Sequence, residues 1–399
     1  MQIKRISDFQ IFNELEDDWD PLLKNSKSDT IFLTFSWVKA WIKNFLDQDE
    51  LYILCVKNDN DELLGIAPLY KSCFKHLSIF RMNYLAFLGD RDVGSEYLDF
   101  IIKNDFENEV TEFIFTYLWD HRNDYDLLFL KEVPDNSINL NFFTSEKNHK
   151  HYKIRKEMRV CSSFSLPQTF DEYIKSLKPR FRTKIRSSRK KLQKGFSVKF
   201  YECDPGHELE KKLIQLFTLH QKKWVAGGNT GSFYKIAKRR FYRDIASPFL
   251  ANNWLKFYFL EVDGKTIACQ FSFLYNNRIL HLQEGFDINY GEYDIGNVLR
   301  GFVMEKIIAE KVNTYDFLGG ITYHKKNWGA KEHFSCHLTF ALKFKLKLFV
   351  YFNFHQFLKI LKFFIPEFLL EKRRKKLTKE LENSIAANRS KYLNINPPF

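Results

Sequence analysis

Two side chains near residue 284 are placed to exchange protons with a reacting group. Glu284 lies late in the apolar run 279–286, and His281 comes three residues before it. A carboxylate at the end of a strand can take a proton from an incoming nucleophile, so Glu284 is the predicted general base and His281 a predicted substrate contact. The alternatives are a solvated strand-end carboxylate for Glu284 and a hydrogen-bonded structural histidine for His281.

A second set of reactive side chains follows the next apolar run. Asp316 interrupts the run 315–318. A carboxylate buried there needs partners because burying it bare is costly, so Asp316 is interpreted equally as a loop-orienting group or as a substrate ligand. Tyr323 lies on the following loop, where its hydroxyl can protonate a leaving group. We predict Glu284, Asp316 and Tyr323 as the catalytic residues.

Two glycines precede a predicted helix between these sets. Gly291, Gly296 and Asn297 come directly before the helix expected from Val298. Glycines let backbone N–H groups approach phosphate oxygens, and a helix N-terminus favours negative charge. These three are therefore the predicted cofactor-binding residues, with an ordinary strand-to-helix turn as the alternative.

The segment 173–201 carries eleven Lys or Arg side chains and no acidic residue. Pro179 predicts the start of a helix there and Gly195 its end. A solvated linker helix, a phosphate clamp and a nucleic-acid surface are the three interpretations, and salt dependence separates them. The predicted phosphate ligands, counted as substrate-binding residues, are Arg180, Arg182 and Arg186.

The elements that must position these residues form an α/β pattern in the second half. Apolar spacing and turn residues predict three antiparallel strands, a loop, a helix and a final strand. The predicted strands cover 254–262, 266–275, 279–286 and 314–318, and the predicted helices cover 208–224, 233–245 and 298–311.

The first half is predicted as another α/β module. Asp8 is expected to cap a helix to Leu23, and Thr34 another to Leu46. Predicted strands cover 51–56, 63–70, 84–88, 97–102 and 126–131, with a helix over 108–121. The expected domains are 1–150, 151–339 with the basic helix 180–194, and an amphipathic, basic helical tail over 340–399.

Composition restricts the chemistry further. The net charge of +13 attracts anions such as phosphorylated cofactors, nucleic acid or a membrane face. The six scattered cysteines form no C-x-x-C pair, so we expect no metal site and mostly buried thiols in a reducing compartment. No apolar stretch reaches the ~18 residues of a spanning helix, so the expected location is cytoplasmic, with peripheral membrane contact through the tail as an option.

Several motifs together are similar to one family. They are Leu219–Trp224, Gly285–Asp287, Tyr293–Asn297 and Tyr315–Gly329, joined in the first half by Phe35–Trp37, Gly65–Tyr70 and Glu96–Asp99. The sequence resembles the CelD-like GNAT acyltransferases, relatives of the Fem peptidoglycan ligases found around bacterial exopolysaccharide and cellulose gene clusters. The resemblance implies an α/β fold of tandem GNAT modules, with mixed sheets flanked by helices.

The resemblance also implies a function. It is N-acyl transfer from acyl-CoA, with acetyl-CoA as co-substrate and no permanently bound cofactor, to an amine such as an amino sugar or cell-envelope precursor. A Fem-like ligase using aminoacyl-tRNA and a non-catalytic scaffold at the membrane face are the alternatives. By the same resemblance Lys325 and Lys326 contact an anionic substrate or the reacting carbonyl, and His220 lines the acceptor pocket or anchors its helix. The loop departs from the family's phosphate-binding pattern, which leaves only Gly291 and Gly296 for close backbone approach.

Overall fold

The computed structural model describes residues 1–76, 80–343, 345 and 348. Residues 1–343 form one compact unit. Beyond that unit, almost all of the predicted tail lies outside the described residues.

The first helices form where the sequence predicts them, with one break. Asp8 caps α1 (Phe9–Asn13) by accepting hydrogen bonds from two N–H groups of its first turn. The sequence predicts one helix to Leu23, but the chain forms two, α1 and α2 (Glu16–Lys24). α3 (Phe35–Phe45) buries its predicted apolar face.

The Thr34 side chain does not cap α3 as predicted. Thr34 is the N-cap residue, but its side chain makes no capping hydrogen bond. Instead the carboxylate of Asp20, on α2, accepts a hydrogen bond from the N–H of Phe35 at 2.8 Å. A neighbouring helix therefore satisfies a donor that the sequence assigns to a local side chain.

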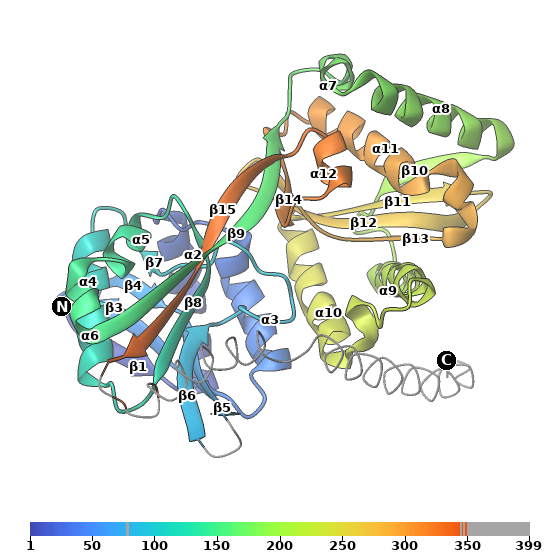
Figure 1. Ribbon diagram of the computed structural model, residues 1–399. Coiled ribbons are helices and arrows are strands. Elements are labelled where there is room, and N and C mark those ends of the chain that lie inside the picture. Colours follow the sequence, from blue (N-terminus) through green and yellow to red (C-terminus); the bar gives the residue numbers. More distant parts are fainter. Residues whose placement is uncertain (77–79, 344, 346–347, 349–399) are drawn as a thin grey trace, which may run out of the picture. The chain divides into compact units, whose positions relative to one another are not determined.

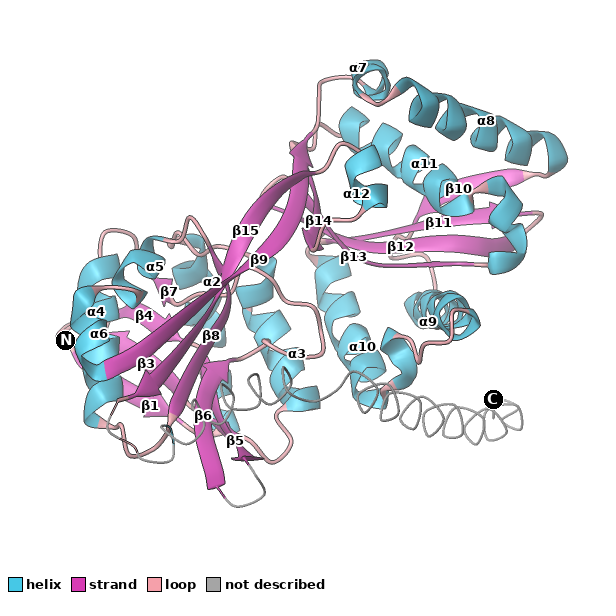
Figure 2. Cartoon of the chain, viewed as in Figure 1, coloured by secondary structure: helices cyan, strands magenta, loops and turns pink. Residues whose placement is uncertain are grey.

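The strands of the described residues form two sheets (Figures 1 and 2). The smaller has the order β1-β3-β4-β7, and the larger has the order β10-β11-β12-β13-β14-β9-β15-β8-β6-β5-β2. The smaller sheet holds β1 (Gln2–Ile6), β3 (Ile53–Lys57), β4 (Leu63–Ala67) and β7 (Ile101–Ile102). The larger holds β2 (Glu50–Leu51), β5 (Leu69–His76), β6 (Phe80–Phe87), β8 (Leu127–Pro134), β9 (Tyr152–Ser165), β10 (Val198–Glu202), β11 (Leu255–Val262), β12 (Lys265–Tyr275), β13 (Arg278–Phe286), β14 (Thr314–Gly319) and β15 (Lys331–Leu342).

Helices cover both faces of the sheet at β10–β13 (Figure 1). The remaining helices are α4 (Glu107–Asp120), α5 (Ile138–Phe143), α6 (Glu146–His151), α7 (Phe170–Ser176), α8 (Pro179–Gly195), α9 (Leu209–Ala226), α10 (Ile236–Ala251), α11 (Ile295–Ala309) and α12 (Tyr323–Asn327). Figure 1 shows α8 and α11 on one face of β10–β13, and α9 and α10 on the other. One core cluster joins Ile185 of α8 and Val303 and Ile307 of α11 to Tyr258 and Ile279 of the sheet.

Two long strands were not predicted. β9 and β15 pair antiparallel along twelve residues each, and β15 also pairs with β8. Their partners lie far away in the sequence, so no local pattern of turn residues marks them. β15 thus places the end of the predicted second module beside a strand of the first, while the division at residues 150 and 339 stays a prediction.

The predicted fold class is confirmed, because mixed sheets are flanked by helices on an α/β plan. Five cysteines are buried and Cys73 is exposed, and all six are free thiols. Within the described ranges, no helix is both long and apolar enough to cross a bilayer, and no cluster of three His, Cys, Asp or Glu side chains is arranged to hold a metal ion.

Candidate active site

β13 and β14 run parallel at first and then part. Their paired register extends only from Arg278 opposite Thr314 to Leu280 opposite Asp316. A cavity of about 470 Å³ lies where they separate, and we call it the splay cavity. Strand residues 281–284 and 317–319 line it, together with Gly94, Glu96, His220, Lys223, Trp224, Arg300, Thr322, His324 and Lys325.

Arg300 enters the splay cavity from α11 with a side chain that is only 2% exposed. Its guanidinium donates hydrogen bonds to Glu284 and to His324, and one terminal nitrogen lies 3.5 Å from Nδ1 of His281. Within the described part of the chain its Nε has no hydrogen-bond partner. Glu284 and His281 therefore meet around an arginine that the sequence analysis did not single out.

Glu284 is ionised in this setting. Burial is the largest single influence and would raise its pKa, but the surrounding groups, Arg300 first among them and Lys223 also contributing, together outweigh burial and hold the pKa of Glu284 well below its usual range. Lys223 adds a second cation, with its Nζ 3.5 Å from the carboxylate. A carboxylate so reluctant to hold a proton is a weak base, so the predicted base role, which stays a prediction, gains no support from this geometry.

The histidines around the cavity are neutral at physiological pH. Burial lowers the pKa of His281 to about 3, and the nearby Arg300 charge acts in the same direction. Burial likewise lowers the pKa of His220 to about 4. Nδ1 of His220 has no hydrogen-bond partner among the described residues. The positive charge of the cavity therefore comes from Arg300 and the lysines.

Of the three predicted site residues that follow β14, only Lys325 lines the splay cavity. Lys325 lines the splay cavity and donates hydrogen bonds to the carbonyls of Phe317 at 3.0 Å and Gly319 at 2.6 Å. Lys326 points elsewhere and pairs with Glu332 at 3.0 Å. Tyr323 is 80% exposed and does not line this cavity. As site residues all three stay predictions.

Asp316 is fully buried and bridges the two halves of the chain. It accepts hydrogen bonds from the Tyr97 hydroxyl at 2.8 Å and from the N–H of Leu318 at 2.7 Å, and Arg278 lies 3.4 Å away. Burial raises the pKa of Asp316. It lines neither the splay cavity nor the cavities described below, so the contacts match the loop-orienting interpretation more closely than the catalytic one.

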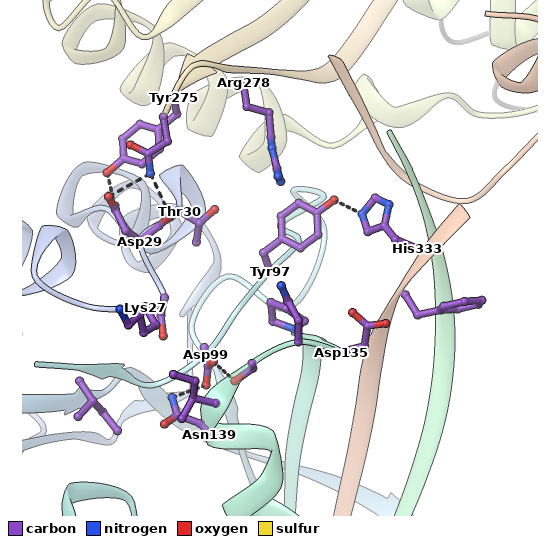
Figure 3. A pocket seen from close by; sticks show the side chains of 18 of the residues that line it. Lys27, Asp29, Thr30, Tyr97, Asp99, Asp135, Asn139, Tyr275, Arg278 and His333 are labelled. Carbon is purple, nitrogen blue, oxygen red and sulfur yellow. Dashed lines mark hydrogen bonds between the residues drawn. The ribbon is translucent and has the colours of Figure 1, made fainter. Parts of the chain in front are cut away.

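Tyr97 also faces a polar cavity of about 530 Å³ (Figure 3). Its hydroxyl is hydrogen-bonded to Nε2 of His333 at 2.9 Å, and Tyr275 on the far wall donates to Asp29 at 2.6 Å. Asp99 lies at its inner end, with Asn139 donating to it at 3.0 Å. Most of these polar groups are hydrogen-bonded to one another, and the Tyr97–His333 and Tyr275–Asp29 bonds join the two halves of the chain.

A third cavity, of about 460 Å³, is basic. We call it the basic cavity, and Lys178, Arg180, Phe181, Lys184, Asn297, Tyr323, His324 and Asn327 line it. It contains three cations and no acidic lining residue. His324 lines the basic cavity and the splay cavity alike, so the two are neighbours.

The basic cavity gathers three residues that were predicted separately. Arg180, Asn297 and Tyr323 line it together, whereas Arg182 and Arg186 do not. Gly291 and Gly296 line none of the three cavities either. The nearest contact that a Cβ on Gly296 would make is at 3.7 Å, an ordinary packing distance. At the start of α11, Asp294 pairs with Lys184 at 3.1 Å and accepts a hydrogen bond from Asn297 at 2.8 Å.

Comparisons with known proteins bear on the fold. Residues 179–326 match the family model described as the acetyltransferase (GNAT) domain. The chain has a GNAT fold. A crystal structure of FemX is similar, with 11% identity, a TM-score of 0.57 and coverage of 85% of this chain and 97% of that one.

Further solved structures resemble this GNAT fold. A conserved protein of unknown function from Bacteroides thetaiotaomicron is 12% identical over 85% of this chain and all of that one, with a TM-score of 0.52. A tandem GNAT protein from the clavulanic acid biosynthesis pathway is 9% identical over 86% of this chain and 98% of that one, with a TM-score of 0.46. The sequence matches no curated protein.

Proposed function

We propose that the protein is an N-acyltransferase that moves an acyl group, above all acetyl, from acyl-CoA to an amine such as an amino sugar or a cell-envelope or exopolysaccharide precursor. The observation that carries this proposal is the arrangement of Arg300, Lys223 and Lys325 around the opening between β13 and β14, with Glu284 as the ionised carboxylate among them. That the protein belongs to the CelD-like group is part of the same proposal.

These cations have a chemical use in acyl transfer. When an amine attacks a thioester carbonyl, the carbonyl oxygen gains negative charge, and fixed donors in a poorly solvated site stabilise it. Arg300 is held rigidly by Glu284 and His324, so it needs no rearrangement when the charge develops. In this proposal Glu284 positions Arg300, whose buried Nε–H has no hydrogen-bond partner among the described residues.

The basic cavity suits the phosphates of the donor. Lys178, Arg180 and Lys184 supply positive charge on α8, and His324 connects this cavity to the reaction centre. Because Asp294 already occupies the start of α11, side chains rather than glycine backbone would hold the phosphates. Acyl-CoA carries its phosphates and its thioester at opposite ends, which matches two neighbouring cavities, one of which is lined by three cations and no acidic residue.

Aminoacyl-tRNA is the second candidate donor. The observation in its favour is the exposed cationic surface of α8, where Lys184, Arg186, Lys190 and Lys194 face solvent. Such a surface binds a phosphate backbone with a steep dependence on salt. Peripheral membrane contact through residues 340–399 and a cytoplasmic location also remain proposals.

The direct test is turnover. Purified protein is given acetyl-CoA and a panel of amines that includes glucosamine, and both thiol release and the mass of the acylated product are measured. We expect acylation in the unmodified protein and a loss of about 10²–10³-fold in kcat/KM for Arg300→Gln. Arg243→Gln, which breaks a surface pair with Glu210 on α9, is the matched control and should match the unmodified protein. Equal rates in the two variants would rule out the proposed role of Arg300.

A further inference from the structure

A line of hydrogen-bonded side chains leads from the splay cavity to a partly exposed histidine on β15. It begins at Glu96, which lines the cavity and whose carboxylate accepts a hydrogen bond from the N–H of Gly319 at 3.0 Å. Cys161 and Ser335, both fully buried, continue it: the Cys161 thiol lies 3.5 Å from Glu96, and Ser335 is 3.8 Å from Cys161. The Ser335 hydroxyl then donates to Glu132 at 2.9 Å.

The line ends at a partly exposed histidine. The carboxylate of Glu132 is hydrogen-bonded to Nε2 of His337 at 2.6 Å, and the His337 side chain is 18% exposed. Arg159 donates to Nδ1 of the same ring at 3.4 Å. The cavity is thereby connected to a surface imidazole through groups that can each carry a proton.

Two carboxylates that lie near each other repel when both are ionised, so one of the two is favoured in its protonated form. Burial, with the Glu132 charge adding to it, raises the pKa of Glu96. Burial is also the largest influence on Glu132, but the hydrogen bond and charge of His337, together with the hydrogen bond from Ser335, outweigh it and lower the pKa of Glu132. The pair therefore holds one proton on Glu96. Glu96 also interacts with the titratable groups Tyr97, Cys161, Asp316 and Lys325.

The backbone is strained where it holds this pair. Tyr97 and Glu132 adopt left-handed φ angles of 57° and 58°, which side chains of this size rarely occupy. The N–H of Leu98 is bonded to the carbonyl of Glu132, so the two strained positions support each other. At Gly319 a Cβ would lie 2.5 Å from the Glu96 carboxylate, so only glycine allows this approach. Strain of this kind is typical of functional sites.

We propose that Glu96, Glu132 and His337 form a proton relay for the acyl transfer, in which Glu96 is the acid–base residue at the reaction centre, Glu132 exchanges protons with solvent, and His337 is the positioning residue that keeps Glu132 ionised. The inference rests on the proposed function. It assigns the base role to Glu96 in place of Glu284, whose pairing with Arg300 leaves it ionised and weakly basic.

The proton balance of the reaction gives each member a task. An ammonium loses two protons on becoming an amide nitrogen: one ends on the departing sulfur and one is released. Glu96 accepts the first proton on one oxygen while its own proton moves through Cys161 and Ser335 to Glu132. The Glu132 side chain is 20% exposed and releases the proton to solvent, and the hydrogen bond from His337 favours its return to the ionised form. The amine then forms the C–N bond, and as the C–S bond breaks Glu96 carries the second proton from nitrogen to sulfur.

Substitutions of Glu96 and His337 test whether these side chains act in proton transfer or only contribute to packing. Glu96→Gln should lower kcat by about 10²-fold or more, which is the usual contribution of a general acid or base. His337→Ala should lower kcat and displace the pH profile, and free imidazole should restore both. The controls are Glu112→Gln and His207→Ala, which alter exposed pairs with Lys147 and Asp204 and should behave like the unmodified protein. Calorimetry with acetyl-CoA should give the same Kd, within twofold, for every variant.

A spectroscopic measurement holds even if a variant is unstable. The infrared spectrum of the unmodified full-length protein in D₂O at neutral pH should contain the carbonyl band of a protonated carboxylic acid, and Glu96→Gln should lack it. The relay is wrong, and the proposed function intact, if amines are acylated but all relay variants keep the rate and the pH profile. The relay is equally wrong if no such band is present. If the unmodified protein binds acetyl-CoA yet acylates no amine, the proposed function fails and the relay fails with it.

Discussion

At the scale of single residues, the site depends on one buried ion pair. The sequence singled out Glu284, His281, His220 and Lys325, and all four line the splay cavity. It missed Arg300 because that residue lies in an apolar helical run, where a lone arginine gives no local signal. Its partner is sixteen residues away, on a strand whose position only the folded sheet fixes.

The ion pair predicts an asymmetric effect on stability. Arg300→Met leaves the Glu284 carboxylate without its main partner and should lower the free energy of unfolding by about 3–5 kcal/mol. Adding Glu284→Gln to Arg300→Met should recover much of that loss, because no buried charge is then left unpaired. Urea denaturation measures both. Arg243→Met, at an exposed pair, is the control and should cost at most about 1 kcal/mol.

The buried histidines predict sensitivity to acid. His220 and His281 have a lower pKa in the folded protein, about 4 and about 3, than the usual 6.5, so between those values the unfolded chain binds more protons. Stability should therefore be complete above about pH 6.5 and fall as the pH drops toward 4, by up to about 1.4 kcal/mol per pH unit for each ring. Denaturation midpoints across this range test it. Replacing both residues by Gln should flatten the slope, and an unchanged slope would contradict the assignment.

At the scale of elements, local patterns predicted most helices and the strands joined by tight turns. Pro179 and Gly195 bound α8 as expected, and the hairpin of β3 and β4 forms at the predicted turn. β9 and β15 were missed because their pairing joins residues about 170 to 190 apart in the chain, a relation that local spacing cannot express. The relay residues Glu132 and His337 lie on β8 and β15, so they were missed for the same reason.

Close packing of α9 on β13 predicts a glycine requirement at Gly285. A Cβ there would lie 2.7 Å from the backbone nitrogen of His220 and 2.9 Å from Leu219, so α9 would have to move. Gly285→Ala should cost about 1–3 kcal/mol in stability. It should also lower turnover, because α9 carries Lys223. Gly195→Ala, which meets nothing within 4 Å, is the control for thermal unfolding and turnover assays. Equal behaviour of the two variants would refute tight packing at this contact.

At the scale of the whole molecule, the halves of residues 1–343 share a sheet and the site between them. Glu96 from the first half reaches a cavity built mainly by the second, and Tyr97 bonds to Asp316. The sequence indicated two modules, but it could not show that the first supplies a wall of the reaction cavity. No pattern within a module records a contact with the other one.

Charge is the other property of the whole molecule, and it makes the choice of donor measurable. The net charge of +13 draws any polyanion to the surface, so weak binding at low salt carries little information. Contacts inside a cavity are screened much less than contacts on an open surface. Binding that survives physiological salt therefore distinguishes a built donor site from general attraction.

The most direct test of the central claim is calorimetric titration with acetyl-CoA and coenzyme A at low and physiological salt. Arg180→Gln, at an exposed residue that lines the basic cavity, is compared with Lys194→Gln, at an exposed residue of the same helix that lines none of the three cavities. We predict binding at both salt concentrations, about tenfold weaker for Arg180→Gln, or about 1.4 kcal/mol, and unchanged for Lys194→Gln at physiological salt. Absence of binding at either salt concentration would contradict the acyl-CoA account, and equal weakening by the two substitutions would contradict the basic cavity as the donor site.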